Sequence, residues 1–193
     1  GIIGTNEAAK AAPDGYTLLL ISVAFPTSIA FNRLPQDMMK SFDPVAMLGS
    51  GPALLVVPAS SPANSVGDLL SLLRQKPGEL NAAAAGIGSF QHMATELFRL
   101  QSKTSFVIVQ YKGGGPALTD TIAGQVQFNL GSLVQMVPHI RSGKLRALGV
   151  SSPKRNAAMP EVPTIAEAGV PGFEVSNWWG IVAPAGTPRP VLD

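Results

Sequence analysis

The stretch LNAAAAGIGSFQHMATELF, Leu80 to Phe98, decides the fold class. It begins with a short apolar run typical of a buried strand, and a loop with two glycines and a serine follows. From about Phe90 the apolar residues recur with a helical period. A strand that ends in exposed backbone amides at the start of a helix is a binding site for an anion. The stretch therefore predicts a strand-loop-helix unit that holds a small negatively charged molecule.

The same pattern returns at Phe106 to Leu118 and, more weakly, at Val126 to Ile140. Strands are predicted at Tyr16 to Ser22, Ala53 to Val57, Leu80 to Ala84, Phe106 to Gln110, Val126 to Leu130 and Leu145 to Val150. Helices are predicted from the capping box of Ser65 and Asp68 to Pro77-Gly78, and at Phe90 to Gln101, Pro116 to Ala123 and Val134 to Ser142. This alternation predicts the α/β class, with a mostly parallel sheet and helices on its faces.

Composition narrows the function classes. The 193 residues are 46% hydrophobic and 13% charged, enough for a sizeable core in one compact unit or two small lobes. The net charge of +2 is small and the basic residues are scattered, so no nucleic-acid partner is expected. The absence of cysteine excludes disulfides and thiol chemistry and fits either a reducing cytoplasm or an export route. No apolar run approaches the roughly 18 residues that span a bilayer, so the chain itself is not expected to be membrane-embedded.

In open α/β sheets, ligands bind beyond the carboxyl ends of the strands. The candidate ligand loops are Ser22 to Phe25, Gly86 to Gln91, Tyr111 to Gly115 and Leu130 to Leu133. They offer hydroxyls and many backbone amides, but Lys112 is their only full positive charge. Since a hydrogen bond to a charged group contributes roughly 1.5 to 3 kcal/mol, a few amides and hydroxyls can hold a carboxylate without an arginine.

No nucleotide cofactor is expected. Gly113-Gly114-Gly115 before Pro116 is equally well explained as a flexible turn, and it lacks the GxxxxGK[ST] spacing. Gly86-Ile87-Gly88 lacks the third glycine of a dinucleotide fingerprint.

Catalytic and metal-binding signals are weak. His92 and His139 are the only histidines, and Glu96 follows His92 without a second histidine or cysteine, so no metal site is expected. A histidine on a helix near a loop is more often structural than a general base. A Ser22 or Ser89 nucleophile activated by His92 stays open, although no GxSxG elbow supports it.

Trp178 and Trp179 are adjacent on an expected strand, before Gly180. Neighbouring side chains of a strand point to opposite faces, so both rings cannot be buried in one direction. One of them is expected to face a cleft or a domain junction.

Six motifs occur in order along the whole chain. They are APDGYTLLL at 12–20, GIGSFQHMATELF at 86–98, YKGGGPALTDTIAGQVQ at 111–127, PHIRSGKLRALGVSS at 138–152, MPEVPTIAEAG at 159–169 and WWGIVAPAGTP at 178–188. Together they resemble the Bug family, the periplasmic solute-binding proteins of tripartite tricarboxylate transporters.

The resemblance implies a two-lobed Venus-flytrap fold of the type II-like class, with the ligand in an interlobe cleft. Lobe I would comprise residues 1–57 and 176–193, and lobe II residues 58–175. Relatives carry a signal peptide, a first strand and a glycine-rich loop before this point, and helices after it. The chain is therefore expected to be truncated at both ends, with lobe I incomplete.

The resemblance also implies a function without catalysis. Proteins of this kind capture small carboxylates, such as di- and tricarboxylates or aromatic acids, in the periplasm and deliver them to membrane permease subunits. Docking on a membrane sensor remains an alternative partner role, and a Ser/His hydrolase is the enzyme alternative.

The expected ligand contacts share a position in the candidate loops or beside the cleft. They are Ser22, Ala24, Phe25, Gly88, Ser89, Phe90, Gln91, Gly131, Ser132 and Trp178. Relatives usually have small hydroxylated residues where Phe90 and Gln91 stand, which favours an aromatic or less polar acid here. Many relatives have an acidic residue where Gly131 stands, so a ligand without a free ammonium is expected.

Overall fold

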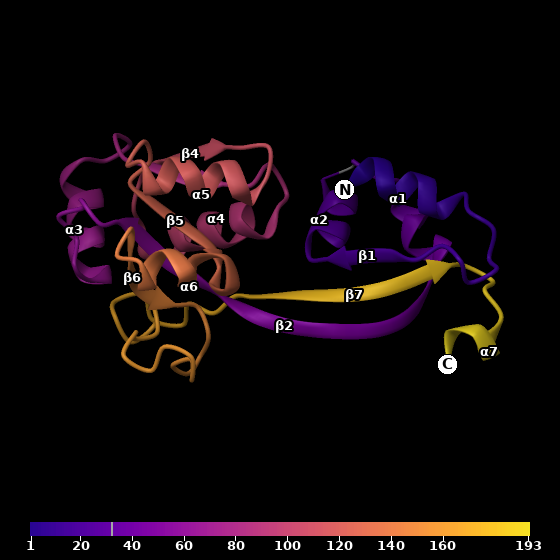
Figure 1. Ribbon diagram of the computed structural model, residues 1–193. Coiled ribbons are helices and arrows are strands. Elements are labelled where there is room, and N and C mark those ends of the chain that lie inside the picture. Colours follow the sequence, from indigo (N-terminus) through magenta and orange to yellow (C-terminus); the bar gives the residue numbers. More distant parts are fainter. Residues whose placement is uncertain (32) are drawn as a thin grey trace. The chain divides into compact units, whose positions relative to one another are not determined.

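The computed structural model describes residues 1–31 and 33–193. They form two compact units: Gly1–Ser50 with Asn177–Asp193 is unit 1, and Gly51–Ser176 is unit 2. The chain passes between the units within strand β2 (Phe42–Pro58) and at the start of strand β7 (Ser176–Pro184) (Figure 1). The lobe boundaries implied by the resemblance stay a prediction.

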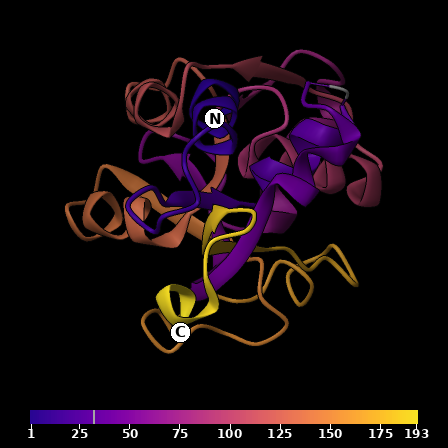
Figure 2. The ribbon, with the colours of Figure 1, turned by 90° about the vertical axis from the view of Figure 1, so that its right-hand side faces the viewer.

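Unit 1 packs helices on one side of a small sheet. Helices α1 (Ile2–Ala9) and α2 (Ala24–Ala30) lie on the same side of β1 (Leu19–Ser22) in Figures 1 and 2. A 3-10 turn, η1 (Gln36–Ser41), precedes β2, and α7 (Arg189–Leu192) follows β7. β1 is antiparallel to β7, which neighbours β2. The buried core of this unit consists of Ala8, Leu34, Met38, Phe42 and Val182.

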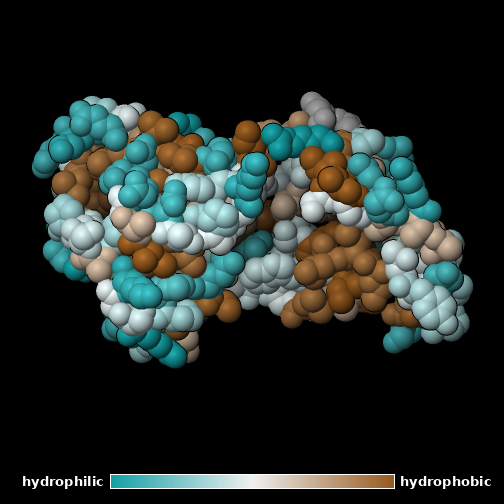
Figure 3. Space-filling view, turned by 45° about the horizontal axis from the view of Figure 1, so that its top comes forward, coloured by the Kyte–Doolittle hydropathy of each residue, from teal (hydrophilic) through white to brown (hydrophobic). Residues whose placement is uncertain are grey.

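Strand alternation decides which residues of β1 are buried. Leu19 and Ile21 pack against the core of unit 1, whereas Leu20 points the other way and is 61% exposed. Tyr16 and Leu18 are also exposed, and brown apolar surface gathers over this unit in Figure 3. The predicted strand from Tyr16 was too long, because the Asp14 side chain accepts a hydrogen bond from Tyr16 N and forms a turn there.

Unit 2 contains the strand-loop-helix units that the sequence predicted. Its strands are β3 (Asn81–Ala84), β4 (Val107–Gln110), β5 (Phe128–Ser132), β6 (Leu145–Val150) and the end of β2. Its helices are α3 (Val66–Gln75), α4 (Phe90–Ser102), α5 (Gly114–Ile122) and α6 (Leu133–Arg141). Helices flank the sheet, so the predicted α/β class is confirmed (Figure 1).

The sheet is mixed, so the prediction of a mostly parallel sheet was wrong. β3 is parallel to both β4 and β5, but β2 is antiparallel to β5 and β6. Parallel neighbours need a crossover connection, which α4 and α5 supply. β2 enters this sheet directly from unit 1, without a preceding crossover helix, and inserts between β5 and β6.

Phe98 of α4 lies at the centre of the unit 2 core and is fully buried. Its ring centroid lies 6.4 Å from that of Phe106, 6.1 Å from that of Phe128 and 5.8 Å from that of Phe173. Ala82 of β3 faces this cluster, while Ala83 faces a second cluster across the sheet. The small alanine side chains let helices approach both faces of β3 closely.

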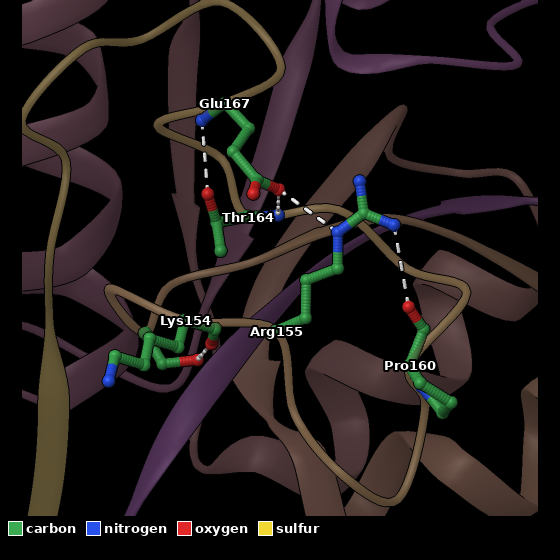
Figure 4. Close-up of polar contacts among 6 residues, drawn as sticks. Lys154, Arg155, Pro160, Thr164 and Glu167 are labelled. Carbon is green, nitrogen blue, oxygen red and sulfur yellow. Dashed lines mark hydrogen bonds and ion pairs between the residues drawn. The ribbon is translucent and has the colours of Figure 1, made fainter.

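Two capping boxes fix local turns of unit 2. The predicted one is confirmed, because Ser65 Oγ accepts from Asp68 N at 3.1 Å. The other holds the irregular segment after β6 (Figure 4): Thr164 Oγ1 accepts from Glu167 N, and Glu167 Oε2 accepts from Thr164 N. Arg155 Nε donates to the same Glu167 oxygen at 3.2 Å.

A pH-dependent contribution to stability is expected from Glu167. The bonds from Thr164 N and Arg155 hold the pKa of Glu167 below its ordinary value of 4.5. A lowered pKa in the folded state stabilises at neutral pH, and that contribution is lost as the pH falls through the folded-state pKa. Glu167→Gln should therefore lower the melting temperature at pH 7, and the gap to the parent should close below pH 4.5.

Glu174→Gln, an exposed change on the same segment, is the matched control and should leave the melting curve unchanged at both pH values. A gap for Glu167→Gln that keeps its size at low pH would contradict the assignment of the stabilisation to the ionised carboxylate.

No helix among the described residues combines the length and the apolar character that crossing a membrane requires.

Candidate functional site

Three helices of unit 2 begin at one edge of its sheet. β3 is parallel to β4 and β5, so the carboxyl ends of these strands share that edge. α4, α5 and α6 start there, with Ser89, Gly113 and Ser132 as their N-caps. Each helix start presents backbone amides and the positive end of a helix dipole. The edge is therefore chemically suited to bind an anion.

The loop before α4 is fixed by its own hydrogen bonds. Ser89 Oγ accepts from His92 N at 3.2 Å, and Ser89 N donates to Gly86 O at 3.1 Å. Gly86 and Gly88 have φ values of +118° and +81°, which favour glycine. A methyl group at Gly86 would also lie 3.2 Å from Tyr111 O, so the loop packs closely against the end of β4.

His92 has a structural position in this loop. Its Nδ1 accepts a hydrogen bond from Gly88 N at 3.2 Å, and its Nε2 lies 3.7 Å from Glu96 Oε1. Nδ1 therefore acts as a hydrogen-bond acceptor within the loop, and Nε2 faces the Glu96 carboxylate. The structural interpretation of His92 therefore accounts for both ring nitrogens.

The Ser89–His92 hydrolase alternative finds no support in this geometry. Ser89 Oγ bonds to the backbone amide of His92, and the Nδ1 that could take its proton is engaged by Gly88 N. Ser22, the other candidate nucleophile, belongs to unit 1, whereas His92 belongs to unit 2.

The loop before α5 is anchored by Tyr111. Its hydroxyl donates to Asp120 Oδ2 at 2.7 Å, across the first turns of α5. Burial and the neighbouring Asp120 carboxylate raise the pKa of Tyr111 to about 12. The hydroxyl therefore stays a hydrogen-bond donor at neutral pH and ties the end of β4 to α5.

Gln91 and Gly131 come together at the end of β5. A methyl group built on Gly131 would lie 2.6 Å from Gln91 Nε2 and 3.2 Å from Asn129 Oδ1, and would overlap Met136 Cε. Gln91 is buried at the start of α4, whereas the ring of its neighbour Phe90 packs against the main core. Asn129 donates to Thr121 Oγ1 at 3.1 Å.

Three of the four expected contacts of unit 1 line a cavity within that unit, and Trp178 does not. A space of about 190 Å³ is bordered by α1, β1 and α2, and Ser22, Ala24 and Phe25 line it. Ser22 Oγ accepts from Ala24 N at 3.3 Å. Trp178 and Trp179 are both half-buried on β7, where Trp179 pairs with Ser22. That the expected residues of both units contact a ligand remains a prediction.

Gln91 and Gly131 were each expected to contact the ligand, but their contact with each other was not predicted. Asn129, a fully buried amide on β5, and the Tyr111–Asp120 hydrogen bond were not predicted either. The polar Asn129 within an apolar strand was the available signal. In the described part of the chain, no three His, Cys, Asp or Glu side chains gather as a metal site.

The family model described as the tripartite tricarboxylate transporter family receptor, TctC, matches residues 1–193. The chain belongs to this family. A curated relative, BugT of Bordetella pertussis, is 37% identical over 195 residues, which cover 100% of this chain and 60% of BugT. The resemblance to the Bug family is thereby confirmed.

Solved structures are also similar to this TctC-family chain. "R. palustris Rpa4515 with adipate" matches with a TM-score of 0.92 and 38% identity, covering 100% of this chain and 65% of that one. MatC (Rpa3494) from Rhodopseudomonas palustris, with bound malate, matches with a TM-score of 0.90 and 35% identity, covering 99% and 66%. The chain thus spans less than two thirds of the length of each of these proteins. The family is one of receptors, which agrees with a solute-binding role rather than catalysis.

Proposed function

We propose that the chain is part of a periplasmic receptor that captures a small carboxylate and delivers it to the membrane permease subunits of a tripartite tricarboxylate transporter. The observation that carries this proposal is the convergence of three helix N-termini at one sheet edge of unit 2. Adipate and malate, bound to two structural neighbours, support the carboxylate class.

The chemistry of this edge favours an anion held by neutral donors. The N-cap positions are two serines and a glycine, and no acidic side chain lies in the first turn of α4, α5 or α6. Lys112, in the loop before α5, is exposed. Backbone amides, hydroxyls and helix dipoles therefore provide the positive potential. Gly131 supplies no carboxylate for a ligand ammonium, so the ligand is expected to lack one.

The test is a thermal shift measurement with adipate, malate, benzoate and aspartate. A ligand that binds only the folded state raises the melting temperature, and a hundredfold excess over Kd adds about 2.7 kcal/mol of stability. At least one acid without an amino group should raise the melting temperature. Adipamide, the uncharged diamide of adipate, is the matched control and should have no effect. Equal shifts with adipate and adipamide, or no shift with any acid, would contradict the proposal.

A further inference from the structure

A second pocket of unit 2 lies at the start of β6, and we call it the β6 pocket. It has a volume of about 360 Å³ and borders the turn between α6 and β6. β5 and β6 are both antiparallel to β2, so they run in the same direction. The start of β6 therefore lies at the edge of the sheet opposite the three helix starts, and the β6 pocket is separate from the proposed carboxylate edge.

The lining of the β6 pocket combines apolar surface with two charged side chains. The apolar part comes from α6, β6 and the segment after β6, and it consists of Ile140, Leu145, Ala147, Met159 and Val162. Arg146 and Glu161 are the cation and the anion among the described residues that line the pocket. Neither forms an ion pair with another described residue. The charge of Arg146 is therefore not neutralised by a carboxylate within the described part of the chain.

Arg146 is held in place by neutral carbonyl groups. Its Nη1 donates to Ser61 O at 3.0 Å and to Ala63 O at 2.9 Å, and its Nη2 donates to Ala59 O at 3.4 Å. Its Nε makes no hydrogen bond with the described residues. Nε and Nη2 share one side of the planar guanidinium, and this side can donate two parallel hydrogen bonds to one carboxylate. Arg146 thus combines a fixed position with a side that is suited to bind an anion.

We propose that the β6 pocket binds a small amphipathic monocarboxylate, with the carboxylate on the Nε side of Arg146 and the hydrocarbon part against the apolar lining. This inference goes beyond the proposed function and does not depend on it. The guanidinium matches a carboxylate in shape and in charge. Removing the hydrocarbon part from water adds to the affinity. A second carboxylate in that part would lose its hydration without a partner, so the pocket selects against dicarboxylates.

Hexanoate is a suitable probe, and hexanamide, its uncharged amide, is the matched control. The Nε–H signal of Arg146 in a nitrogen-15 spectrum can be assigned by its loss in Arg146→Lys. Hexanoate should shift this signal together with the backbone amides of residues 145–147, 159, 161 and 162. It should bind about tenfold or more tightly than hexanamide, because hydrogen bonds to a charged group are roughly twice as strong as neutral ones.

Ala59→Phe tests the location of the site without changing the side chain of Arg146. Ala59 is exposed and lines the pocket, so a ring at this position would occupy part of it, while the backbone carbonyl can still accept from Arg146. Hexanoate binding should weaken about tenfold, since the ring and the ligand compete for the same space. Ser60→Phe is the matched control, because Ser60 is also exposed but is not part of the lining. It should leave the affinity unchanged.

Glu161→Gln tests the sign of the ligand charge. Glu161 is exposed, so solvent screens its repulsion of a bound anion, and its neutralisation should strengthen hexanoate binding by only about twofold to threefold. Weaker binding in this variant, equal affinities for hexanoate and hexanamide, or full affinity in Ala59→Phe would each overturn the inference. So would an Arg146 Nε–H signal that hexanoate leaves in place. The proposed function is tested separately, at the other edge of the sheet.

Discussion

Ser89→Asp is expected to weaken carboxylate binding by roughly a hundredfold or more while leaving the fold intact. Aspartate caps a helix as well as serine does, so its side chain can still accept from His92 N. It places a negative charge at the start of α4, where the ligand carboxylate is proposed to bind. Two like charges about 4 Å apart repel by about 4 kcal/mol at an effective dielectric constant of 20. Calorimetry with the best acid from the thermal shift panel measures the loss.

Ser89→Asn is the matched control. Asparagine has nearly the same shape as aspartate and the same capping ability, but no charge. It should change the affinity far less than Ser89→Asp does. If both variants bind the acid as tightly as the parent, the start of α4 is not the anion site. If both lose binding equally, shape rather than charge is responsible.

Phe98→Ala is expected to destabilise unit 2 by about 3–5 kcal/mol, the usual cost of removing a buried phenylalanine side chain. Phe98 is fully buried, and its ring packs against those of Phe106, Phe128 and Phe173. Trp178 and Trp179 lie on β7 and belong to unit 1, so tryptophan fluorescence is not a direct probe of the unit 2 core. Native-state hydrogen exchange of the β3 and β5 amides is the suitable measurement.

Leu100→Ala, on the same helix, is the control for this substitution. Leu100 is 74% exposed, so its replacement should change the stability by less than about 0.5 kcal/mol. A loss for Phe98→Ala no larger than that for Leu100→Ala would contradict the central position of Phe98 in the core.

Local patterns were sufficient to predict most elements of unit 2. β6 has the predicted bounds, Leu145–Val150, and α4 begins at Phe90 as predicted. The capping residue and the apolar period act within a few residues, so both can be recognised in the sequence. The length of β2 was underestimated, because the predicted strand covered Ala53 to Val57 and the observed strand spans Phe42–Pro58. Pro44 and the glycines and proline at 49–52 interrupt the pattern, whereas pairing with neighbouring strands sustains the strand.

In the candidate site, too, only features that depend on residues close together in the sequence could be predicted. The glycine-rich loops and the helix start near Phe90 were evident from the sequence, because strand ends and helix starts leave local signals. The burial of Gln91 was not, since it depends on the space left by Gly131, forty residues away in the sequence. The resemblance implied a bulkier and less polar edge at Phe90 and Gln91, because relatives usually have small hydroxylated residues there. The structure instead packs the Phe90 ring against the core and turns the Gln91 amide towards Gly131.

Titration with adipate in nitrogen-15 spectra tests whether the helix starts of unit 2 bind a carboxylate. If they do, the largest shifts in unit 2 should fall on the amides of Gly86 to Gln91, Gly113 to Gly115 and Gly131 to Leu133. Adipamide should leave these signals in place. Saturable binding of adipate that leaves these three groups of amides unchanged would show that the helix starts of unit 2 are not the carboxylate site.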